Sequence, residues 1–411
     1  MIKAQRGTKD ILFLESYNWE RIEKIASNIF HLAGFSKIQT PIFEATELFN
    51  RGVGESSDIV NKEMYTFSIG GIDKKETSIT LRPENTAGVV RAFIEHNLSR
   101  LSPPQKFWYF GPMFRYERPQ AGRQRQFHQI GVEVFGCENP SMDAEIIQLA
   151  LSFLKAFNLS DFEVEINSLG CTKCKNEYKA SIKEVLSSHI DKMCEDCKIR
   201  YQKNPLRILD CKQNSCQEIL ELEEVKKIVL KDYICPDCKN HFETLCSYLD
   251  ELNINYKINK FLVRGLDYYN RTVFEVKSSK LGSQSAILGG GRYDNLTETL
   301  GGPKTPAIGF ALGVERLYSL IEKVESKKLD YFVVSNNPKE ALKLTTKLRE
   351  QGKSAEFDYQ NRKFAKQLEK ASKTALCAII LGEDEINQGY YSVKDLTTAE
   401  QRKIDSFNDL I

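Results

Sequence analysis

The sequence predicts an α+β protein in which a larger domain, built on a mixed and mostly antiparallel sheet with flanking helices, precedes a small α/β domain. Two runs rich in aromatic and β-branched residues, 106–116 and 126–135, flank a polar loop, which is typical of antiparallel strands. Helical spacing dominates residues 171–259, where Lys and Glu become frequent, so we expect a helical insertion in the larger domain. After residue 330 strand and helix patterns alternate, which favours a mostly parallel sheet.

The remaining elements follow from local patterns. Residues 16–32 carry apolar side chains at helical spacing, and Gly34 follows as a helix stop. The segment 38–43 is a short strand, and its Pro41 places it near an edge or a bend. The charged stretch 322–329 is typical of a linker, so we expect domains at 1–325, interrupted by 171–259, and at 328–411. Further strands are expected at 260–276, 287–292, 309–313, 331–335 and 375–381, and helices after 313 and at 339–351 and 362–372.

Composition limits the function classes. With 411 residues, of which 41% are hydrophobic and 28% charged, the chain is expected to be soluble and to form two or three domains. Its apolar runs fall short of the roughly 18 residues that span a membrane. The first ten residues lack the apolar core of a secretory signal, so a cytoplasmic location is expected. A net charge of +2 means that any polyanion site must be a local patch.

The predicted hairpin carries a candidate nucleotide site. Arg115 ends its first strand, Arg118, Arg123 and Arg125 lie in or after the loop, and Phe127 opens the return strand. Guanidinium groups bind phosphate through two parallel hydrogen bonds, and an aromatic ring offers a flat face to a base. A solvated basic loop would also explain this pattern. The glycine-rich GxxxxGK[ST] phosphate loop is missing from the sequence, so a P-loop enzyme is not expected.

A second candidate lies at the strand-to-helix junction 313–317. Helix N-termini favour anions, so Arg316 in the first turn is misplaced for helix stability. This mismatch suggests a functional arginine, although a side chain that reaches into solvent would fit equally well.

These motifs together resemble a known family. Pro41 after a long helix, FRYE with its loop through Phe127, and GFALGVERL are similar, in order and spacing, to motifs 1, 2 and 3 of class II aminoacyl-tRNA synthetases. The segments RGLDYYNRTVFEV and GGGRYDNL, with LRPENTAG and RQFHQIGVEVFG, resemble the bacterial histidyl-tRNA synthetases over essentially the whole chain. One departure is Asn85, where bacterial members are expected to have glycine.

The resemblance implies a role for each matching residue. Arg264 and Arg115 would be catalytic, at the α-phosphate. The histidine-binding set would be Glu84, Asn85, Thr86, Gln129, Glu133, Tyr268 and Tyr269, with Glu84 and Gln129 at the ammonium group and Glu133 and Tyr269 at the ring nitrogens. The ATP-binding set would be Arg115, Glu117, Arg123, Phe127 and Arg316.

The resemblance also implies the reaction and the partners. L-Histidine would react with ATP, accompanied by Mg²⁺, to give histidyl-adenylate and pyrophosphate, and the histidine would pass to the 3′ end of tRNA(His). The tail would be an anticodon-binding domain, and the chain a homodimer. A pocket that hydrogen-bonds imidazole rejects analogues without help, so no editing domain is expected.

Eight of the eleven cysteines lie between residues 171 and 238. The spacing of Cys171, Cys174, Cys194 and Cys197 fits a four-thiolate structural Zn²⁺ site. Cys211 and Cys216 with Cys235 and Cys238 repeat the pattern less clearly. Reduced thiols packed in a helical module are the alternative.

Two other functions remain open at the level of sequence. A regulatory paralogue would keep the catalytic fold but only sense histidine or bind a partner enzyme, and such chains usually lose the tail and the Arg264 segment. A class II synthetase for proline or threonine would share motifs 1 to 3 but not Glu133 or RGLDYYNRTVFE.

Overall fold

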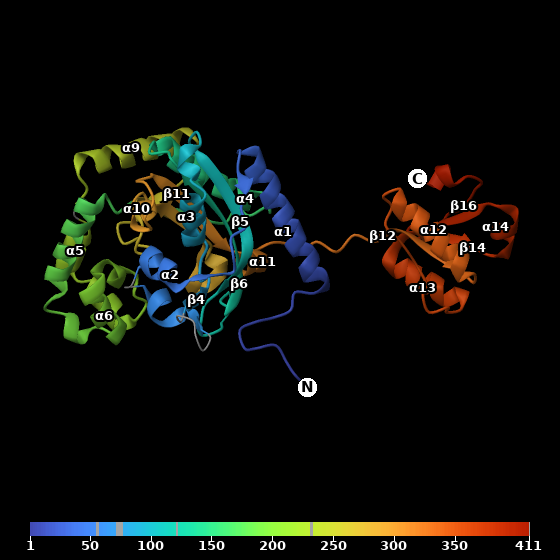
Figure 1. Ribbon diagram of the computed structural model, residues 1–411, viewed down its shortest axis with the longest axis horizontal. Helices are drawn as coiled ribbons and strands as arrows, with labels where there is room; N and C mark the ends of the chain where they lie inside the picture. Colours follow the sequence, from blue (N-terminus) through green and yellow to red (C-terminus); the bar gives the residue numbers. More distant parts are fainter. Residues whose placement is uncertain (55–56, 71–76, 121, 231–232, 411) are drawn as a thin grey trace. The chain divides into compact units, whose positions relative to one another are not determined.

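The computed structural model describes residues 1–54, 57–70, 77–120, 122–230 and 233–410, so Ala121 of the predicted hairpin loop lies outside the described residues. The chain divides into two compact units, residues 1–323 and 324–411 (Figure 1). This boundary lies within the charged stretch 322–329.

An eight-stranded sheet forms the centre of the larger unit. Its central strands are antiparallel and only its edge strands pair in parallel, so the predicted mixed, mostly antiparallel sheet is confirmed. In order across the sheet these are β1 (Ser36–Lys37), β5 (Gln105–Phe114), β6 (Gln126–Phe135), β11 (Ala307–Gly313), β10 (Ala286–Arg292), β9 (Asn270–Lys277), β7 (Glu163–Ser168) and β8 (Lys257–Ile258).

The two faces of the sheet have different roles, and strand β6 shows this division. Ile130, Val132 and Val134 belong to the main core, which α1 (Phe13–Leu32) and α4 (Pro140–Lys155) cover. Because successive side chains of a strand point to opposite faces, the odd-numbered residues 127–135 face the other way. There Phe135 stacks on Phe93 of α3 (Thr86–Glu95) at 4.4 Å between ring centroids. The candidate site lies on this second face.

Two predicted strands are wrong in extent. The segment 38–43 lies between β1 and β2 (Phe43–Ala45), and only its last residue, Phe43, is in a strand. Strand β2 belongs to a separate sheet with β4 (Thr77–Leu81) and β3 (Tyr65–Ile69). Pro41 has no backbone N–H to donate, and it lies where the chain passes from one sheet to the other. Likewise the strand expected at 260–276 begins only at Asn270, because the residues before it form turns.

The insertion is helical, as predicted. It contains α5 (Thr172–Leu186), α6 (Glu195–Lys203), α7 (Asn214–Leu220), α8 (Glu223–Leu230) and α9 (Pro236–Glu251). In Figure 1, α5 and α6 border the larger unit on the side away from α1. Ile182, Leu209 and Val225 form a separate apolar core that also includes Tyr269 and Val273. The insertion therefore packs directly against the segment that leads into β9.

The smaller unit has the predicted alternation of strands and helices, followed by an antiparallel hairpin that the sequence did not predict. Strands β12 (Leu329–Ser335), β13 (Ala355–Phe357) and β14 (Ala375–Leu381) are parallel, and β15 (Tyr391–Asp395) and β16 (Gln401–Ile404) complete the sheet in antiparallel pairing. Its helices are α12 (Pro338–Glu350), α13 (Phe364–Thr374) and α14 (Glu383–Gln388).

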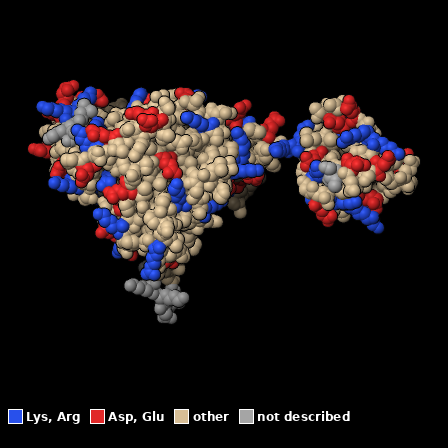
Figure 2. All heavy atoms as spheres, turned by 90° about the horizontal axis from the view of Figure 1, so that it is seen from above, with Lys and Arg blue, Asp and Glu red and all other residues tan. Residues whose placement is uncertain are grey.

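The surface agrees with the small net charge. Basic and acidic side chains are interspersed on the face of each unit that Figure 2 shows. In the described part of the chain, every helix is too short or too polar to cross a membrane.

Candidate active site

A buried carboxylate on the second face of the sheet is the centre of the site. Glu133 lies on β6 and is 1% exposed. The Thr86 hydroxyl donates to its Oε1 at 2.6 Å, and the Tyr293 hydroxyl donates to Oε2. The Tyr109 hydroxyl lies 3.5 Å from Oε1. Burial raises the pKa of Glu133 to about 8, although these hydroxyl groups favour the charged form.

A second buried carboxylate lies nearby at the start of α3. Glu84 is 3% exposed and accepts hydrogen bonds from the backbone N–H groups of Thr86 and Ala87, at 2.8 and 2.9 Å. Burial raises its pKa as well. Among the described residues, neither Glu84 nor Glu133 has an ion-pair partner, so the site has two buried acidic groups that a cationic ligand would stabilise.

Further polar atoms lie around these carboxylates. Gln129 shares a face of β6 with Glu133, and its buried Oε1 atom has no hydrogen-bond partner among the described residues. Tyr269 is buried, and its ring centroid lies 4.7 Å from that of Tyr268, which packs edge-on against Tyr293. Asn85 is directed elsewhere, since its Oδ1 atom accepts a 2.6 Å hydrogen bond from Thr40.

Arg264 lies against a glycine strand. Its Nη1 atom forms an ion pair with Glu275 of β9, and its side chain is 21% exposed. A Cβ atom added at Gly289 of β10 would lie 2.3 Å from Nη2 and 2.4 Å from Cζ of Arg264, so only glycine leaves room for the guanidinium group. Glycine at position 289 therefore positions the arginine.

Replacement of Gly289 with alanine tests this packing. The Arg264 side chain can move aside, so Gly289→Ala is expected to leave the melting temperature nearly unchanged but to lower activity by roughly ten- to a hundredfold through misplacement of the guanidinium. At the next position, a Cβ atom would lie 2.2 Å from the carbonyl oxygen of Gly309, which is backbone. Gly290→Ala should instead lower the melting temperature. If Gly289→Ala and Gly290→Ala change the activity and the melting temperature equally, that result would contradict a positioning role specific to Gly289.

The predicted nucleotide residues are also brought together. The Arg115 guanidinium lies 5.1 Å from the ring centroid of Phe127, and its Nε atom donates to the Pro83 carbonyl at 2.9 Å. Arg123 pairs with Glu117 at 3.1 Å. An arginine thus lies beside a half-buried aromatic ring and beside the loop that carries Glu84.

Arg316 extends from α11 (Val314–Leu320) toward the same hairpin. Its Nη1 atom donates to the Ala286 carbonyl at 2.8 Å and its Nε atom to the Gly122 carbonyl at 3.3 Å. Burial and the nearby charge of Arg123 lower its pKa. Such a group of like charges is unfavourable without an anion, so this arrangement favours a phosphate ligand over the solvent-exposed alternative.

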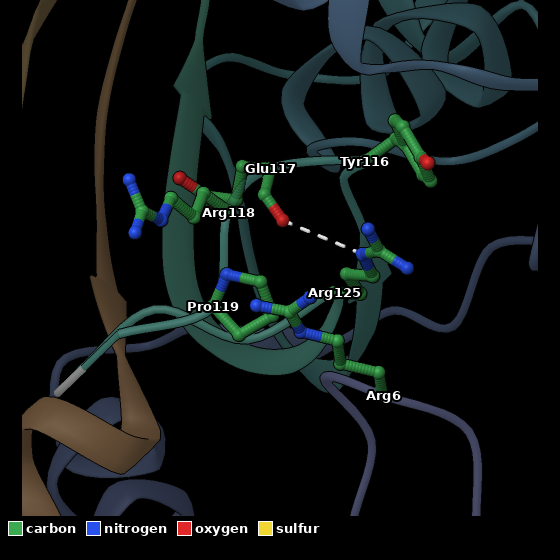
Figure 3. Close-up of a pocket in the computed structure, with 6 residues that line it drawn as sticks. All are labelled: Arg6, Tyr116, Glu117, Arg118, Pro119 and Arg125. Atoms are coloured by element: carbon green, nitrogen blue, oxygen red, sulfur yellow. Dashed lines mark hydrogen bonds between the residues drawn. The ribbon is translucent and has the colours of Figure 1, made fainter.

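A hollow of about 430 Å³ lies at the hairpin loop. Arg6, Tyr116, Glu117, Arg118, Pro119 and Arg125 line it (Figure 3). The Nε atom of Arg125 donates to the Glu117 carbonyl at 3.4 Å, and its guanidinium lies 4.2 Å from the Tyr116 ring centroid. The buried carboxylates Glu84 and Glu133 do not line this hollow, so it is distinct from the candidate site on the face of β6.

Several residues at the site were not singled out from sequence. Tyr109 lies opposite Gly131 in the hairpin, where an added Cβ atom would lie 2.3 Å from its hydroxyl. Glu275 pairs with Arg264, and Tyr293 bonds to Glu133. The signals available were the hairpin register for Tyr109 and the matching segments GGGRYDNL and RTVFEV for the other two.

The predicted grouping of the cysteines is wrong. Cys171 and Cys174 lie with Cys235 and Cys238, whereas Cys194 and Cys197 lie with Cys211 and Cys216. Within each group, the four sulfur atoms are within 4.8 Å of one another. Pairing of neighbours in sequence fails because the 15-residue helix α5, about 22 Å long, separates the first pair from the second.

Comparisons with known proteins agree with this arrangement. Residues 7–317 match the family described as histidyl-tRNA synthetase, and residues 327–410 match the anticodon-binding domain family. A histidine–tRNA ligase of Halothermothrix orenii is 50% identical over 98% of this chain and 96% of its own length, and one of Natranaerobius thermophilus is 46% identical over the same shares. The apo histidyl-tRNA synthetase structure of S. aureus is 36% identical, has a TM-score of 0.80, and covers 98% of this chain and 97% of its own.

Proposed function

This chain belongs to the histidyl-tRNA synthetase family, and we propose that it joins L-histidine to the 3′ end of tRNA(His) in two steps. In the first step, a carboxylate oxygen of histidine attacks the α-phosphorus of magnesium-bound ATP. The bond from that phosphorus to the bridging oxygen breaks, giving histidyl-adenylate and pyrophosphate. In the second, a terminal ribose hydroxyl of the tRNA attacks the histidyl carbonyl carbon, and AMP leaves.

The two unpaired buried carboxylates carry this assignment. We assign Glu84 and the free Oε1 atom of Gln129 to the ammonium group of histidine, since both are acceptors that lack a cation. Glu133 accepts the imidazole N–H, and Tyr269 lies at the other ring nitrogen. Thr86 holds Glu133 in place, while Tyr268 covers the pocket. Asn85 acts through Thr40 and Arg82, with which its side chain forms hydrogen bonds.

The arginines serve the phosphates of ATP. Phe127 stacks on the adenine, and Arg115, close to both Phe127 and Pro83, bridges the α-phosphate and the histidine carboxylate. Arg264 stabilises the negative charge that grows on the α-phosphate during attack, because Gly289 and Glu275 hold its guanidinium in advance. Arg123, Arg316 and Glu117 lie at the outer phosphates and the base edge.

Amino-acid-dependent exchange of radioactive pyrophosphate into ATP tests this function. We expect exchange with histidine and only background exchange with proline or threonine. Exchange driven by proline or threonine would overturn the choice of amino acid. Tight histidine binding without any exchange would instead support the regulatory paralogue, which senses histidine and does not activate it.

Arg316→Ala tests the phosphate assignment separately. Loss of one guanidinium–phosphate contact is expected to raise the KM for ATP by roughly tenfold or more, while the KM for histidine stays within about twofold. Arg51, which is exposed on α2 (Thr46–Val53) and pairs with Glu47, offers a matched control, and Arg51→Ala should change neither value. A rise in the histidine KM alone would contradict the assignment of Arg316.

We also propose that the chain is a homodimer and that its tail binds the anticodon of tRNA(His). Support for the dimer comes from the small sheet of β2, β4 and β3, where Phe43, Phe67 and Ile69 and the preceding Ile42 are between 44% and 58% exposed. Large apolar side chains grouped on a surface are typical of interfaces. Size-exclusion chromatography with light scattering should give twice the chain mass of 47.1 kDa, and a monomer would contradict the dimer.

A further inference from the structure

We propose that the insertion holds two structural zinc ions in separate four-thiolate sites. Site A consists of Cys171, Cys174, Cys235 and Cys238, and site B consists of Cys194, Cys197, Cys211 and Cys216. All eight cysteines are free, and five of them are buried. Four sulfur atoms converging on one point, twice in one small module, are the ligand set that Zn²⁺ takes in structural sites.

The sulfur spacing fits a single tetrahedral ion. Four sulfur atoms at about 2.3 Å from Zn²⁺ lie about 3.8 Å from one another. The Sγ atoms of Cys171 and Cys174 are 3.5 Å apart, and those of Cys194 and Cys211 are 3.8 Å apart. A four-iron cluster places each thiolate on a different iron and spreads the sulfur atoms more widely. The geometry therefore favours one ion per site.

Backbone groups around the sulfur atoms suit thiolates. The N–H of Cys171 donates to Cys238 Sγ at 3.2 Å, and the N–H of Cys235 donates to Cys174 Sγ at 3.1 Å. In site B the N–H of Cys194 donates to Cys216 Sγ at 3.3 Å. Hydrogen bonds of this kind orient metal ligands and stabilise their negative charge. The same kind of contact in both sites distinguishes them from thiols that are merely packed together.

Helix starts supply most of the ligands. Cys171, Cys194 and Cys235 are the N-cap residues of α5, α6 and α9, and in each case the partner cysteine lies in the first turn. Free N–H groups and the helix dipole lower the cost of a thiolate there. Beside site A, Gly170 has φ +69°, and an added Cβ atom would lie 2.4 Å from Cys174 Cβ, so the backbone is closely packed onto the cluster.

Site A braces the segment that carries Tyr268 and Tyr269. Helix α5, which Cys171 caps, carries Lys175, whose Nζ atom donates to the carbonyls of Asp267 and Tyr269 at 2.7 and 2.8 Å. Through this contact, the ion in site A would position the proposed histidine pocket, a consequence that rests on the proposed function.

Site B braces the same segment from another side. Asn204, at the end of α6, donates to Asp267 Oδ1 at 2.6 Å. Arg200 of α6 bonds to Asp58 at 2.8 Å, which ties the helix to the body of the larger unit. The two ions are therefore positioning elements rather than catalytic ones.

Metal analysis of the full-length, unaltered chain is the primary test. Elemental analysis of protein purified without a metal-affinity tag should find about two zinc per chain and no stoichiometric iron. A thiol reagent should react rapidly with only Cys137, Cys246 and Cys377, and with the remaining eight as zinc is released. Less than a tenth of an equivalent of zinc, eleven equally reactive thiols, or an iron chromophore would each overturn the two zinc sites.

Paired substitutions test which cysteines belong together. Cys171→Ser with Cys235→Ser alters site A alone and should leave about one zinc per chain. Cys171→Ser with Cys194→Ser alters both sites and should leave almost none. Grouping by nearest neighbours in sequence predicts the reverse for both pairs, so that result would overturn the grouping. Cys137→Ser with Cys377→Ser is the matched control and should keep two zinc ions.

A kinetic measurement separates the positioning role from general destabilisation. The site A pair of substitutions should raise the KM for histidine about tenfold and leave the KM for ATP within about twofold. An equal rise in the KM for histidine and in the KM for ATP would overturn the positioning role. If the unaltered chain holds two zinc ions but catalyses no histidine-dependent exchange, the proposed function fails and the two sites stand. If the zinc content of the paired variants does not follow the grouping of the cysteines, the two zinc sites fail, whatever the activity of the chain.

Discussion

Arg264→Ala is expected to lower the rate of histidine-dependent pyrophosphate exchange by roughly a hundred- to a thousandfold, while histidine binding stays measurable. Negative charge grows on the α-phosphate only as the carboxylate attacks, so a donor aimed there stabilises the transition state more than bound histidine. Glu275 and the glycine strand hold the guanidinium before substrate arrives, which removes the cost of reorganisation. The rate is measured by exchange and histidine binding by calorimetry.

Two controls make the result specific. Arg51→Ala removes an exposed arginine of the same unit and should keep the parent rate. Arg264→Lys keeps a positive charge but loses the planar fork, so it should recover only part of the rate. A rate within a few-fold of the parent for Arg264→Ala would show that this arginine does not stabilise the transition state.

Glu133→Gln should weaken histidine binding by roughly a hundredfold. In the proposed pocket this carboxylate accepts the ring N–H, and an amide in its place offers a weaker acceptor and an extra donor with no partner. Because Thr86 and Tyr293 already donate to Glu133, the amide also conflicts with them. Calorimetric titration with histidine measures the loss, and ATP binding should be unaffected. An unchanged dissociation constant for histidine would remove Glu133 from the pocket.

The same substitution changes how stability depends on pH. Burial raises the pKa of Glu133 from 4.5 to about 8 in the folded chain, so between these values the folded state keeps a proton that the unfolded chain has released. This contribution to the free energy of unfolding is fully present below about pH 4.5 and is lost as the pH rises through 8. Glutamine cannot titrate, so the parent should lose stability relative to Glu133→Gln between pH 5 and 9. If the melting temperatures of the parent and of Glu133→Gln change in parallel with pH, that result would contradict a raised pKa of Glu133.

Much of the candidate site could be predicted from sequence because its residues lie in the strongest strand pattern of the chain. The hairpin of β5 and β6 is long and rich in strand-forming residues, and one face of β6 carries Phe127, Gln129 and Glu133. Glu84 and Arg264 could also be named, because each lies in a segment that resembles the family. Contacts between distant parts of the chain could not be predicted: Tyr293 meets Glu133 across 160 positions.

The cysteine grouping and the strand expected at 38–43 show the physical reason why some predictions from sequence were wrong. Spacing within CxxC pairs is local, but the choice of partner pair depends on the length and packing of α5, which no local pattern specifies. Similarly, the β-branched run around Pro41 signals extended chain, and only the position of both sheets determines that it connects β1 to β2 instead of forming one strand. The segment GGGRYDNL also divides, since buried Arg292 pairs with Asp143 in the interior while Tyr293 reaches the site.

The alternation along β6 makes the three proposed recognition functions depend on one pairing register. Phe127, Gln129 and Glu133, which we propose for the base, the ammonium group and the ring, all lie on one face, and Ile130 and Val132 fill the core on the other. A shift by a single residue turns every side chain of a strand to the opposite face. Loss of one residue at the start of this strand would therefore bury the acceptors among apolar side chains and abolish ATP and histidine recognition together. The close approach of the Tyr109 hydroxyl to Gly131 opposes such a shift, because any other residue in that place would clash with it.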